Sequence, residues 1–140
     1  MPAALRYLLD TNILSYVVKH THPRLNARLA ATPLEQLAIS AVSVMEIRYG
    51  LALNPAVAER LAPGLNDLID GMTTLPFDSG CADVCATLRV TLRKIGRPIG
   101  AYEALIAATA QAHDLIVVTG NESEFAQVPG VRLENWASAR

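Results

Sequence analysis

The stretch Leu115-Ile116-Val117-Val118-Thr119 decides the fold class of this chain of 140 residues. It is short, continuously apolar and rich in β-branched side chains, which is typical of a strand buried on both faces. Sheets buried on both faces are mostly parallel, because the connections between parallel strands run as helices across those faces. This stretch therefore favours an α/β fold.

Strand and helix patterns alternate on both sides of that stretch. Strands are predicted at residues 5–9, 37–40, 73–76, 115–119 and 131–133, and helices at residues 13–20, 23–31, 43–53, 55–70, 79–95, 101–113 and shortly after 120. Such alternation predicts a single domain over residues 1–140, a three-layer α/β/α sandwich around a central, mostly parallel sheet of four or five strands.

Composition limits the function classes. The net charge is −1 and 51% of the residues are hydrophobic, so nucleic-acid binding would need a local basic patch. Arg89, Arg93, Lys94 and Arg97 form one candidate, although a solvated helix face explains them equally well. No apolar run is long enough to cross a membrane and the N-terminal segment lacks a signal-peptide pattern, so we expect a cytoplasmic protein.

The remaining reactive side chains are few. Cys81 and Cys85 lie four apart in a predicted helix with no second thiol pair for a zinc site, and we interpret them as small core residues. The three histidines, His20, His22 and His113, are expected at the surface or at helix ends. Trp136 is expected to pack against the C-terminal strand.

Polar clusters follow three of the predicted strands. They lie at residues 10–12 (Asp-Thr-Asn), between Ser40 and Glu46, and at residues 119–121 (Thr-Gly-Asn). Because ligands of open α/β sheets bind at the carboxyl ends of the strands, these clusters point to one site.

Three carboxylates belong to these clusters or to the helix after Gly100, and each has a purely structural alternative. Asp10 could cap the following helix. Ser43 and Glu46 fit a capping box, with Ser43 as the N-cap. Glu103 could be stabilised by the helix dipole in the first turn of its helix.

Carboxylates that converge on one edge repel one another unless a cation offsets their charge. Mg²⁺, or Mn²⁺, held by Asp10, Glu46 and Glu103 would do so, because Mg²⁺ binds a few carboxylates, several waters and substrate phosphates. Such a metal activates water for displacement at phosphorus. Asn12, Thr119 and Asn121 would then position the water or a phosphate.

The same residues carry a resemblance to a known family. The segments at residues 9–12 (Leu-Asp-Thr-Asn), 43–50 (Ser-Val-Met-Glu-Ile-Arg-Tyr-Gly) and 96–107 (Gly-Arg-Pro-Ile-Gly-Ala-Tyr-Glu-Ala-Leu-Ile-Ala) resemble successive motifs of VapC toxins, which are PIN-domain ribonucleases. Residues 117–125 (Val-Val-Thr-Gly-Asn-Glu-Ser-Glu-Phe) and 129–136 (Pro-Gly-Val-Arg-Leu-Glu-Asn-Trp) resemble the C-terminal end of that family. Each motif is weak alone, but together they span nearly the whole chain in the right order.

The resemblance implies roles for individual residues. Asp10 matches the first metal-binding aspartate of the family, and Glu46 matches its helix glutamate. Asn121 falls in the segment that supplies a more variable fourth Asp or Asn, and Thr119 matches a threonine beside it. Arg97 lies in a basic loop that would meet the RNA backbone.

Glu103 departs from the family, which normally has aspartate at this position. Glutamate keeps the charge but moves the oxygens outward by one methylene, which near-octahedral Mg²⁺ tolerates poorly. Two hypotheses follow: a natural variant with a shifted metal, or a deliberate or selected attenuation of a toxic nuclease.

The resemblance also implies partners. It predicts the toxin component of a type II toxin–antitoxin system, a metal-dependent endoribonuclease inhibited by a VapB-type antitoxin that covers apolar grooves and reaches the acidic site. DNA would be bound only through that complex, and a homodimer is expected. The stretches at residues 96–100 and 133–136 resemble the subgroup that cleaves initiator tRNA.

Other functions fit less well. A haloacid-dehalogenase-like phosphatase needs a second aspartate where this chain has Asn12, and a receiver domain needs a late lysine, whereas Lys94 is the last one. A catalytically inactive PIN-like module that binds RNA or protein remains the alternative, because Glu103 departs from the family pattern.

Overall fold

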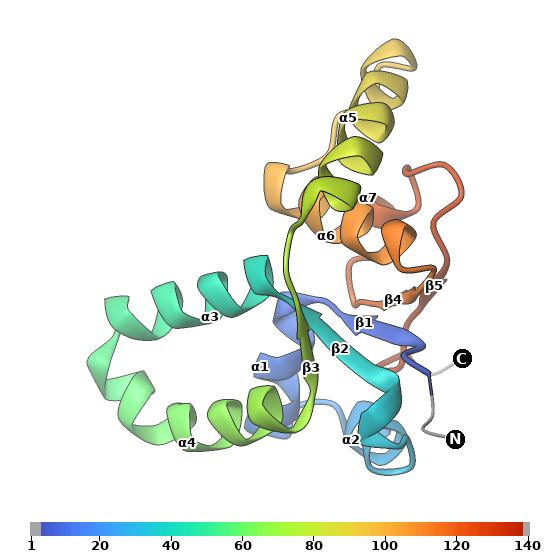
Figure 1. Ribbon diagram of the computed structural model, residues 1–140. Helices are drawn as coiled ribbons and strands as arrows, with labels where there is room; N and C mark the ends of the chain where they lie inside the picture. Colours follow the sequence, from blue (N-terminus) through green and yellow to red (C-terminus); the bar gives the residue numbers. More distant parts are fainter. Residues whose placement is uncertain (1–3, 139–140) are drawn as a thin grey trace.

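The structure is a computed structural model that describes residues 4–138. Residues 1–3, part of the segment searched for a signal peptide, and residues 139–140 lie outside the described residues. The elements in chain order are β1 (Tyr7–Leu9), α1 (Thr11–Lys19), α2 (Pro23–Ala30), a 3₁₀ turn (Leu34–Gln36), β2 (Leu37–Ser40), α3 (Ala41–Leu53), α4 (Pro55–Gly71), β3 (Thr73–Leu75), α5 (Ser79–Lys94), α6 (Ala101–Ala112), β4 (Ile116–Val118), α7 (Glu122–Phe125) and β5 (Leu133–Glu134) (Figure 1).

The five strands form one parallel sheet in the order β3-β2-β1-β4-β5. The chain starts in the middle of the sheet, builds one half outward through β2 and β3, and then returns to add β4 and β5 on the other side of β1. This reversal makes the carboxyl ends of β1 and β4 a topological switch point, where open α/β sheets bind ligands. The predicted α/β fold with four or five strands is confirmed.

Alternate strand residues feed two separate cores, which gives the predicted three layers. Tyr7 and Leu9 of β1 face a core shared with α1, α2, α3 and α4, whereas Leu8 faces a core shared with α5 and α6. Val117 and Val118 of β4 divide between the same two cores. Both faces of the central strands are therefore buried, which explains their continuous apolar sequence.

Several element boundaries differ from the prediction. The helix predicted from residue 13 begins at Thr11, directly after β1, because Asp10 is its N-cap. The helix predicted from Ser43 begins at Ala41 with Ser40 as its N-cap. The last strand is Leu133–Glu134, shifted from the predicted residues 131–133.

Two parts project from the sheet. Helices α3 and α4 form an arm on one side, and α5 extends beyond the body at the opposite end from α2 (Figure 1). Trp136 is buried, as expected of a packing residue, but its ring partner is Tyr7 of the central strand β1, with ring centroids 4.9 Å apart, rather than a residue of the C-terminal strand. No helix among residues 4–138 is long and apolar enough to cross a membrane.

Candidate active site

Asp10 lies at the carboxyl end of β1 and is 7% exposed. One of its carboxylate oxygens accepts the backbone N–H of Thr11 at 2.8 Å, and the other accepts the Thr119 hydroxyl at 2.9 Å. Asp10 is therefore confirmed as the N-cap of α1, and its other oxygen is oriented by Thr119 at the sheet edge where the metal site is predicted. Its two hydrogen bonds hold the carboxylate in one orientation at the switch point between β1 and β4.

The pKa of Asp10 is raised above its usual value, chiefly because burial disfavours the charged carboxylate. The hydrogen bonds from Thr119 and Thr11 act against this rise, whereas the negative charges of Glu103 and Glu46 add to it. The carboxylates of Glu103 and Glu46 thus each lie within electrostatic reach of Asp10.

Glu46 reaches the site for a reason other than the one predicted. The capping box of Ser43 and Glu46 is wrong, because α3 starts earlier and Ser40 accepts the backbone N–H of Ser43 at 3.0 Å. Glu46 consequently lies in the second turn of α3, where its carboxylate accepts the Thr11 hydroxyl at 2.8 Å. The Ser43 hydroxyl oxygen lies 2.8 Å from the same Thr11 oxygen.

Thr11 is thus a site residue that the sequence argument did not single out. Its backbone N–H binds Asp10 and its hydroxyl binds Glu46, so one residue orients two carboxylates from different elements. The signal that could have found it is its position directly after Asp10 in the polar cluster at the end of the first strand.

Glu103 lies in the first turn of α6, and its side chain folds back over the N-cap residue Gly100. A Cβ at position 100 would collide with the Glu103 carboxylate, so glycine makes room for this conformation. The backbone N–H of Gly100 does not bind Glu103 but donates to the Glu124 carboxylate at 2.7 Å.

Thr119, Asn121 and Glu124 connect α6 to the sheet. The Thr119 hydroxyl accepts the backbone N–H of Asn121 at 2.8 Å while donating to Asp10. The Asn121 amide donates to Glu124 at 2.9 Å, and the other oxygen of Glu124 holds Gly100. Glu124 is a second residue that the sequence argument missed, because its partner Gly100 is distant in sequence.

Two predicted residues lie apart from this network. Asn12 is exposed and, within residues 4–138, forms no hydrogen bond with Asp10, Glu46 or Glu103. Arg97 is exposed in the loop between α5 and α6. The described histidines lie at helix ends, as predicted: His20 ends α1, His22 precedes α2 and His113 ends α6.

The donor set fits a hard divalent cation. No Lys or Arg of the described chain forms an ion pair with Asp10, Glu46 or Glu103, so their mutual repulsion is not offset by protein cations. The oxygens of these three carboxylates do not all come within 4.8 Å of one another. The three side chains are therefore spaced more widely than the ligands of a closed, all-protein metal cage. Mg²⁺ characteristically keeps several waters and so suits an acidic site of this width.

Comparison with known proteins gives a consistent relationship. The model of the PIN domain family matches residues 7–131. The tRNA(fMet)-specific endonuclease VapC of Shigella flexneri is 32% identical over 133 residues, which cover 95% of this chain and 99% of that protein. Toxin FitB of Neisseria gonorrhoeae is 35% identical over 125 residues, covering 84% of this chain and 89% of that protein.

A solved structure agrees with this relationship. The DNA-bound VapBC of Salmonella typhimurium contains a chain that superposes with a TM-score of 0.86 at 31% identity, covering 94% of this chain and 98% of that one. The similarity extends over almost the full length of both chains, so it includes every element that contributes to the acidic site.

Proposed function

Because this chain belongs to the PIN-domain family and, within it, to the VapC toxins, we propose that it is a divalent-metal-dependent endoribonuclease and the toxin of a toxin–antitoxin pair. The observation that carries the proposal is the grouping of three carboxylates at the switch point of the sheet: Thr11 links the buried Asp10 to Glu46, and Glu103 lies within electrostatic reach of Asp10. The fold alone would not suffice, because one fold hosts many functions.

Asp10, Glu46 and Glu103 would hold the cation, which we propose to be Mg²⁺ or Mn²⁺. Once bound, it supplies the positive charge that activates water and stabilises the negative charge developing on the phosphate. Thr11 orients the carboxylates of Asp10 and Glu46, and Thr119 orients Asp10 from the other side. Asn121 and Thr119 are proposed to position the water or a phosphate, and Asn12, exposed at the start of α1, to contact a phosphate from outside.

The proposal is tested with purified protein and RNA. We expect endonucleolytic cleavage in Mg²⁺ or Mn²⁺ that stops when a chelator removes the metal and returns when metal is restored. Activity that persists in chelator would contradict the proposal. Absence of cleavage, both by this chain and by its Glu103→Asp variant, would instead favour the alternative of an inactive module that binds RNA or protein.

The substrate proposal is initiator tRNA, by similarity to the Shigella flexneri endonuclease. The substrate is tested separately from the nuclease activity, by sequencing the 5′ ends of cellular RNA after expression. Cleavage confined to other RNAs would overturn the substrate and leave the nuclease proposal intact.

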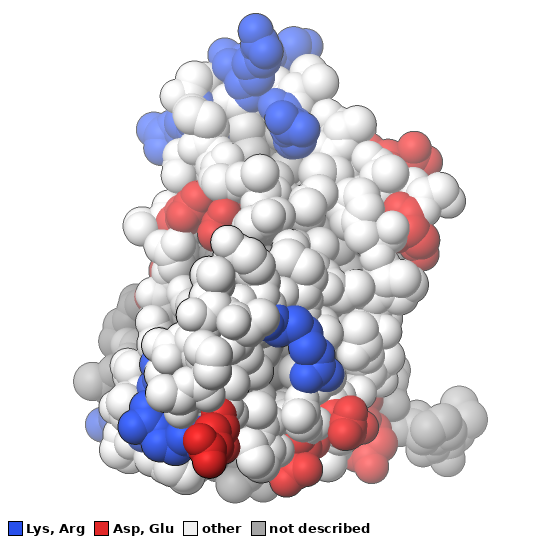
Figure 2. All heavy atoms as spheres, turned by 90° about the vertical axis from the view of Figure 1, so that its left-hand side faces the viewer, with Lys and Arg blue, Asp and Glu red and all other residues white. Residues whose placement is uncertain are grey.

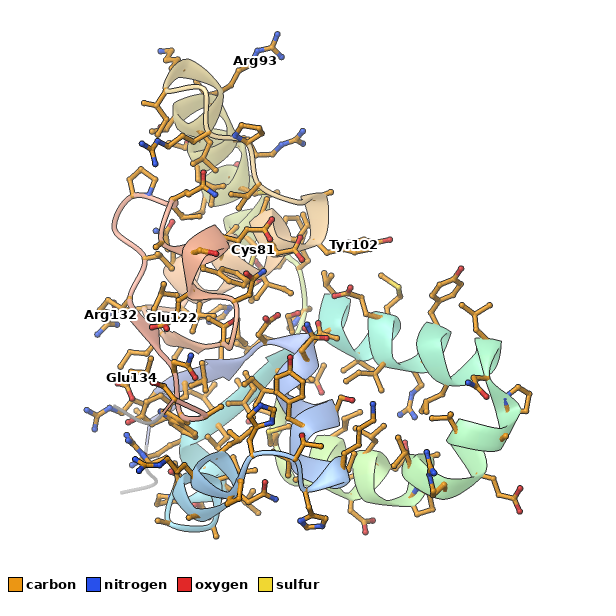
Figure 3. All side chains as sticks on the ribbon, turned by 180° about the vertical axis from the view of Figure 1, so that it is seen from behind. Cys81, Arg93, Tyr102, Glu122, Arg132 and Glu134 are labelled. Carbon is orange, nitrogen blue, oxygen red and sulfur yellow. The ribbon has the colours of Figure 1, made fainter. Side chains whose placement is uncertain are left out.

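A basic tip on the molecule is the proposed contact for the RNA backbone. Exposed Arg89, Arg93 and Lys94 of α5 lie near Arg97, which follows the turn at Gly96 (φ 68°). Figure 2 shows Lys and Arg side chains gathered at this end of the molecule, and Figure 3 shows Arg93 at its extremity. The low overall charge makes such a local patch the main electrostatic attraction for RNA.

We therefore predict that replacing Arg93 and Arg97 together by Gln weakens RNA binding and lowers its dependence on salt. Each lost phosphate contact should reduce the slope of log affinity against log salt by roughly 0.7–0.9, hence about 1.5 in total. Filter binding at several salt concentrations measures this slope. The charge-matched control is Lys19→Gln with Arg60→Gln, both exposed on the other layer; equal slopes in the two double variants would exclude the tip as the RNA contact.

An apolar stripe on α3 is the proposed binding surface for a VapB-type antitoxin. Met45, Tyr49 and Leu53 recur at helical spacing and are 42%, 63% and 67% exposed. The stripe adjoins Glu46, and Tyr102, itself 46% exposed, projects from the start of α6 toward the same side (Figure 3). A partner segment lying there would bury the stripe and present a basic side chain to the carboxylates.

We predict that Tyr49→Ala weakens binding of the cognate VapB-type antitoxin about 10- to 100-fold, as loss of a buried aromatic anchor does. RNA cleavage by the free toxin should be unchanged, because Tyr49 does not contact the carboxylates. Isothermal titration calorimetry measures the affinity, with Val90→Ala, 53% exposed on α5, as the control. If Tyr49→Ala and Val90→Ala weaken antitoxin binding equally, the apolar stripe on α3 is not the antitoxin-binding surface.

Two further proposals concern assembly. DNA binding is attributed to the toxin–antitoxin complex, in line with the DNA-bound VapBC of Salmonella typhimurium. The predicted homodimer stays a prediction, which light scattering of the free toxin will check.

A further inference from the structure

A second group of potential metal ligands lies away from the acidic site. Among residues 4–138, Asp78, Cys81 and His113 are the His, Cys, Asp or Glu side chains that place three ligand atoms within 4.8 Å of one another. The set offers one carboxylate oxygen, one thiol sulfur and one imidazole nitrogen. Nothing in the proposed nuclease function uses these residues.

The helix pair α5–α6 brings the three residues together. Asp78 is the N-cap of α5 and accepts the backbone N–H of Cys81 at 3.0 Å, which places the carboxylate beside the first turn. His113 ends α6, which runs back along α5 after the loop between them (Figure 1). Figure 3 shows Cys81 at the base of α5, next to α6.

Cys81 is enclosed, whereas its two companions are open to solvent. The Cys81 residue is fully buried, and its thiol donates weakly to the carbonyl oxygen of Pro76 at 3.8 Å. Asp78 and His113 are both exposed. A cation at this point would therefore have sulfur on its inner side, oxygen and nitrogen at the rim, and an outward position left for water.

The turn that carries His113 is held in place by other residues. Asp114 adopts a left-handed conformation (φ 56°), which is uncommon for a residue other than glycine. Arg132 fixes this turn by donating to the Asp114 carbonyl oxygen at 2.6 Å and to its carboxylate at 2.8 Å. The end of α6 is thus in contact with the segment before β5 through hydrogen bonds and an exposed ion pair.

We propose that Asp78, Cys81 and His113 form a site for Zn²⁺ or a related borderline-soft cation, in addition to the hard-metal site at the sheet edge. Thiolate and imidazole ligands select such ions over Mg²⁺. Three protein ligands and one water complete the tetrahedral coordination that Zn²⁺ prefers. On binding, the thiol proton leaves to solvent and the sulfur lone pair forms the bond to the metal, so no oxidant or reductant is required.

A cation bound at this site would cross-link the start of α5 and the end of α6. Both helices matter to the proposed nuclease, because α5 carries the basic tip and α6 begins with Gly100 and Glu103. A cation that binds only the folded chain stabilises the fold by mass action. At a free cation concentration ~100-fold above the Kd, the stabilisation should raise the Tm by roughly 8 °C.

The test uses Co²⁺ as a spectroscopic substitute for Zn²⁺ in the full chain carrying Asp10→Asn, which weakens metal binding at the acidic site. We expect one equivalent of Co²⁺ to produce a thiolate-to-cobalt charge-transfer band that Zn²⁺ removes by competition. The acidic site contains no thiol, so the band reports on a cysteine outside that site and is independent of whether the chain is a nuclease.

Variants separate the three ligands from their neighbours. Cys81→Ser should abolish the band, and His113→Gln, at an exposed residue whose change spares the core, should weaken Co²⁺ affinity at least about 10-fold. Cys85→Ser and His20→Gln should retain both the band and the Zn²⁺-dependent rise in Tm. Absence of the band in the parent protein, or its persistence at full affinity in His113→Gln, would overturn the proposal.

Discussion

Asp10→Asn is expected to reduce RNA cleavage on the order of 1,000-fold while the fold remains intact. Removing one carboxylate from a metal that stabilises several kcal/mol of transition-state charge predicts a loss of this size. The amide is nearly isosteric, and its oxygen can still accept the backbone N–H of Thr11, as asparagine does at helix N-caps. Single-turnover cleavage at saturating Mg²⁺ measures the loss.

The same substitution should leave the protein as stable as before, or more stable. The pKa of Asp10 is raised in the folded chain, which means that folding disfavours its charged form and that ionisation at neutral pH costs stability. Asparagine removes that cost, so the Tm at pH 7 should equal or exceed that of the unaltered chain. Such a result would place Asp10 among residues kept for function at the expense of stability.

Asp70→Asn is the matched control, because it makes the same chemical change at an exposed position on α4. It should leave both cleavage and Tm unchanged. Full cleavage by a folded Asp10→Asn variant would remove Asp10 from the proposed metal site. A collapse of its Tm would show instead that the fold depends on the second carboxylate oxygen of Asp10, which accepts the Thr119 hydroxyl.

The fold was largely predictable because its signals are local. The buried strand at Leu115–Thr119 is recognisable from a few consecutive residues, and alternation with helices limits the topology to a parallel sheet. The boundary errors are local as well. Ser40 and Ser43 are both capable N-caps, and in the structure Ser40, which pairs with Leu75 of β3 as the last residue of β2, caps α3.

The site was predictable only in part, because its geometry depends on contacts distant in sequence. Asp10 and Glu46 could be named, yet Thr11 links them through its backbone N–H to Asp10 and its hydroxyl to Glu46, which lies 35 residues further along the chain. Glu124 escaped notice because its partner Gly100 lies 24 residues away. The proposed grouping of Asp78, Cys81 and His113 was not predictable for a related reason: only the packing of α6 on α5 brings His113 to Cys81.

Glu103→Asp is expected to increase RNA cleavage by up to about 100-fold, because a misplacement of ~1 Å at a reacting centre can cost that much. The longer side chain of Glu103 folds back over Gly100 rather than extending straight from the helix. Aspartate would withdraw the carboxylate from Gly100 by one methylene and restore the residue that the family normally has. Metal titration of cleavage measures both the rate and the apparent Mg²⁺ affinity.

The decisive control is the same shortening at Glu46, where the opposite sign is expected. Glu46 already accepts the Thr11 hydroxyl at 2.8 Å, so Glu46→Asp breaks this contact and should lower cleavage. Opposite responses to an identical chemical change would show that carboxylate placement, not charge, limits activity. If Glu103→Asp leaves cleavage and metal affinity unchanged, attenuation is excluded, and Glu103 is a natural ligand whose extra length the glycine at position 100 already accommodates.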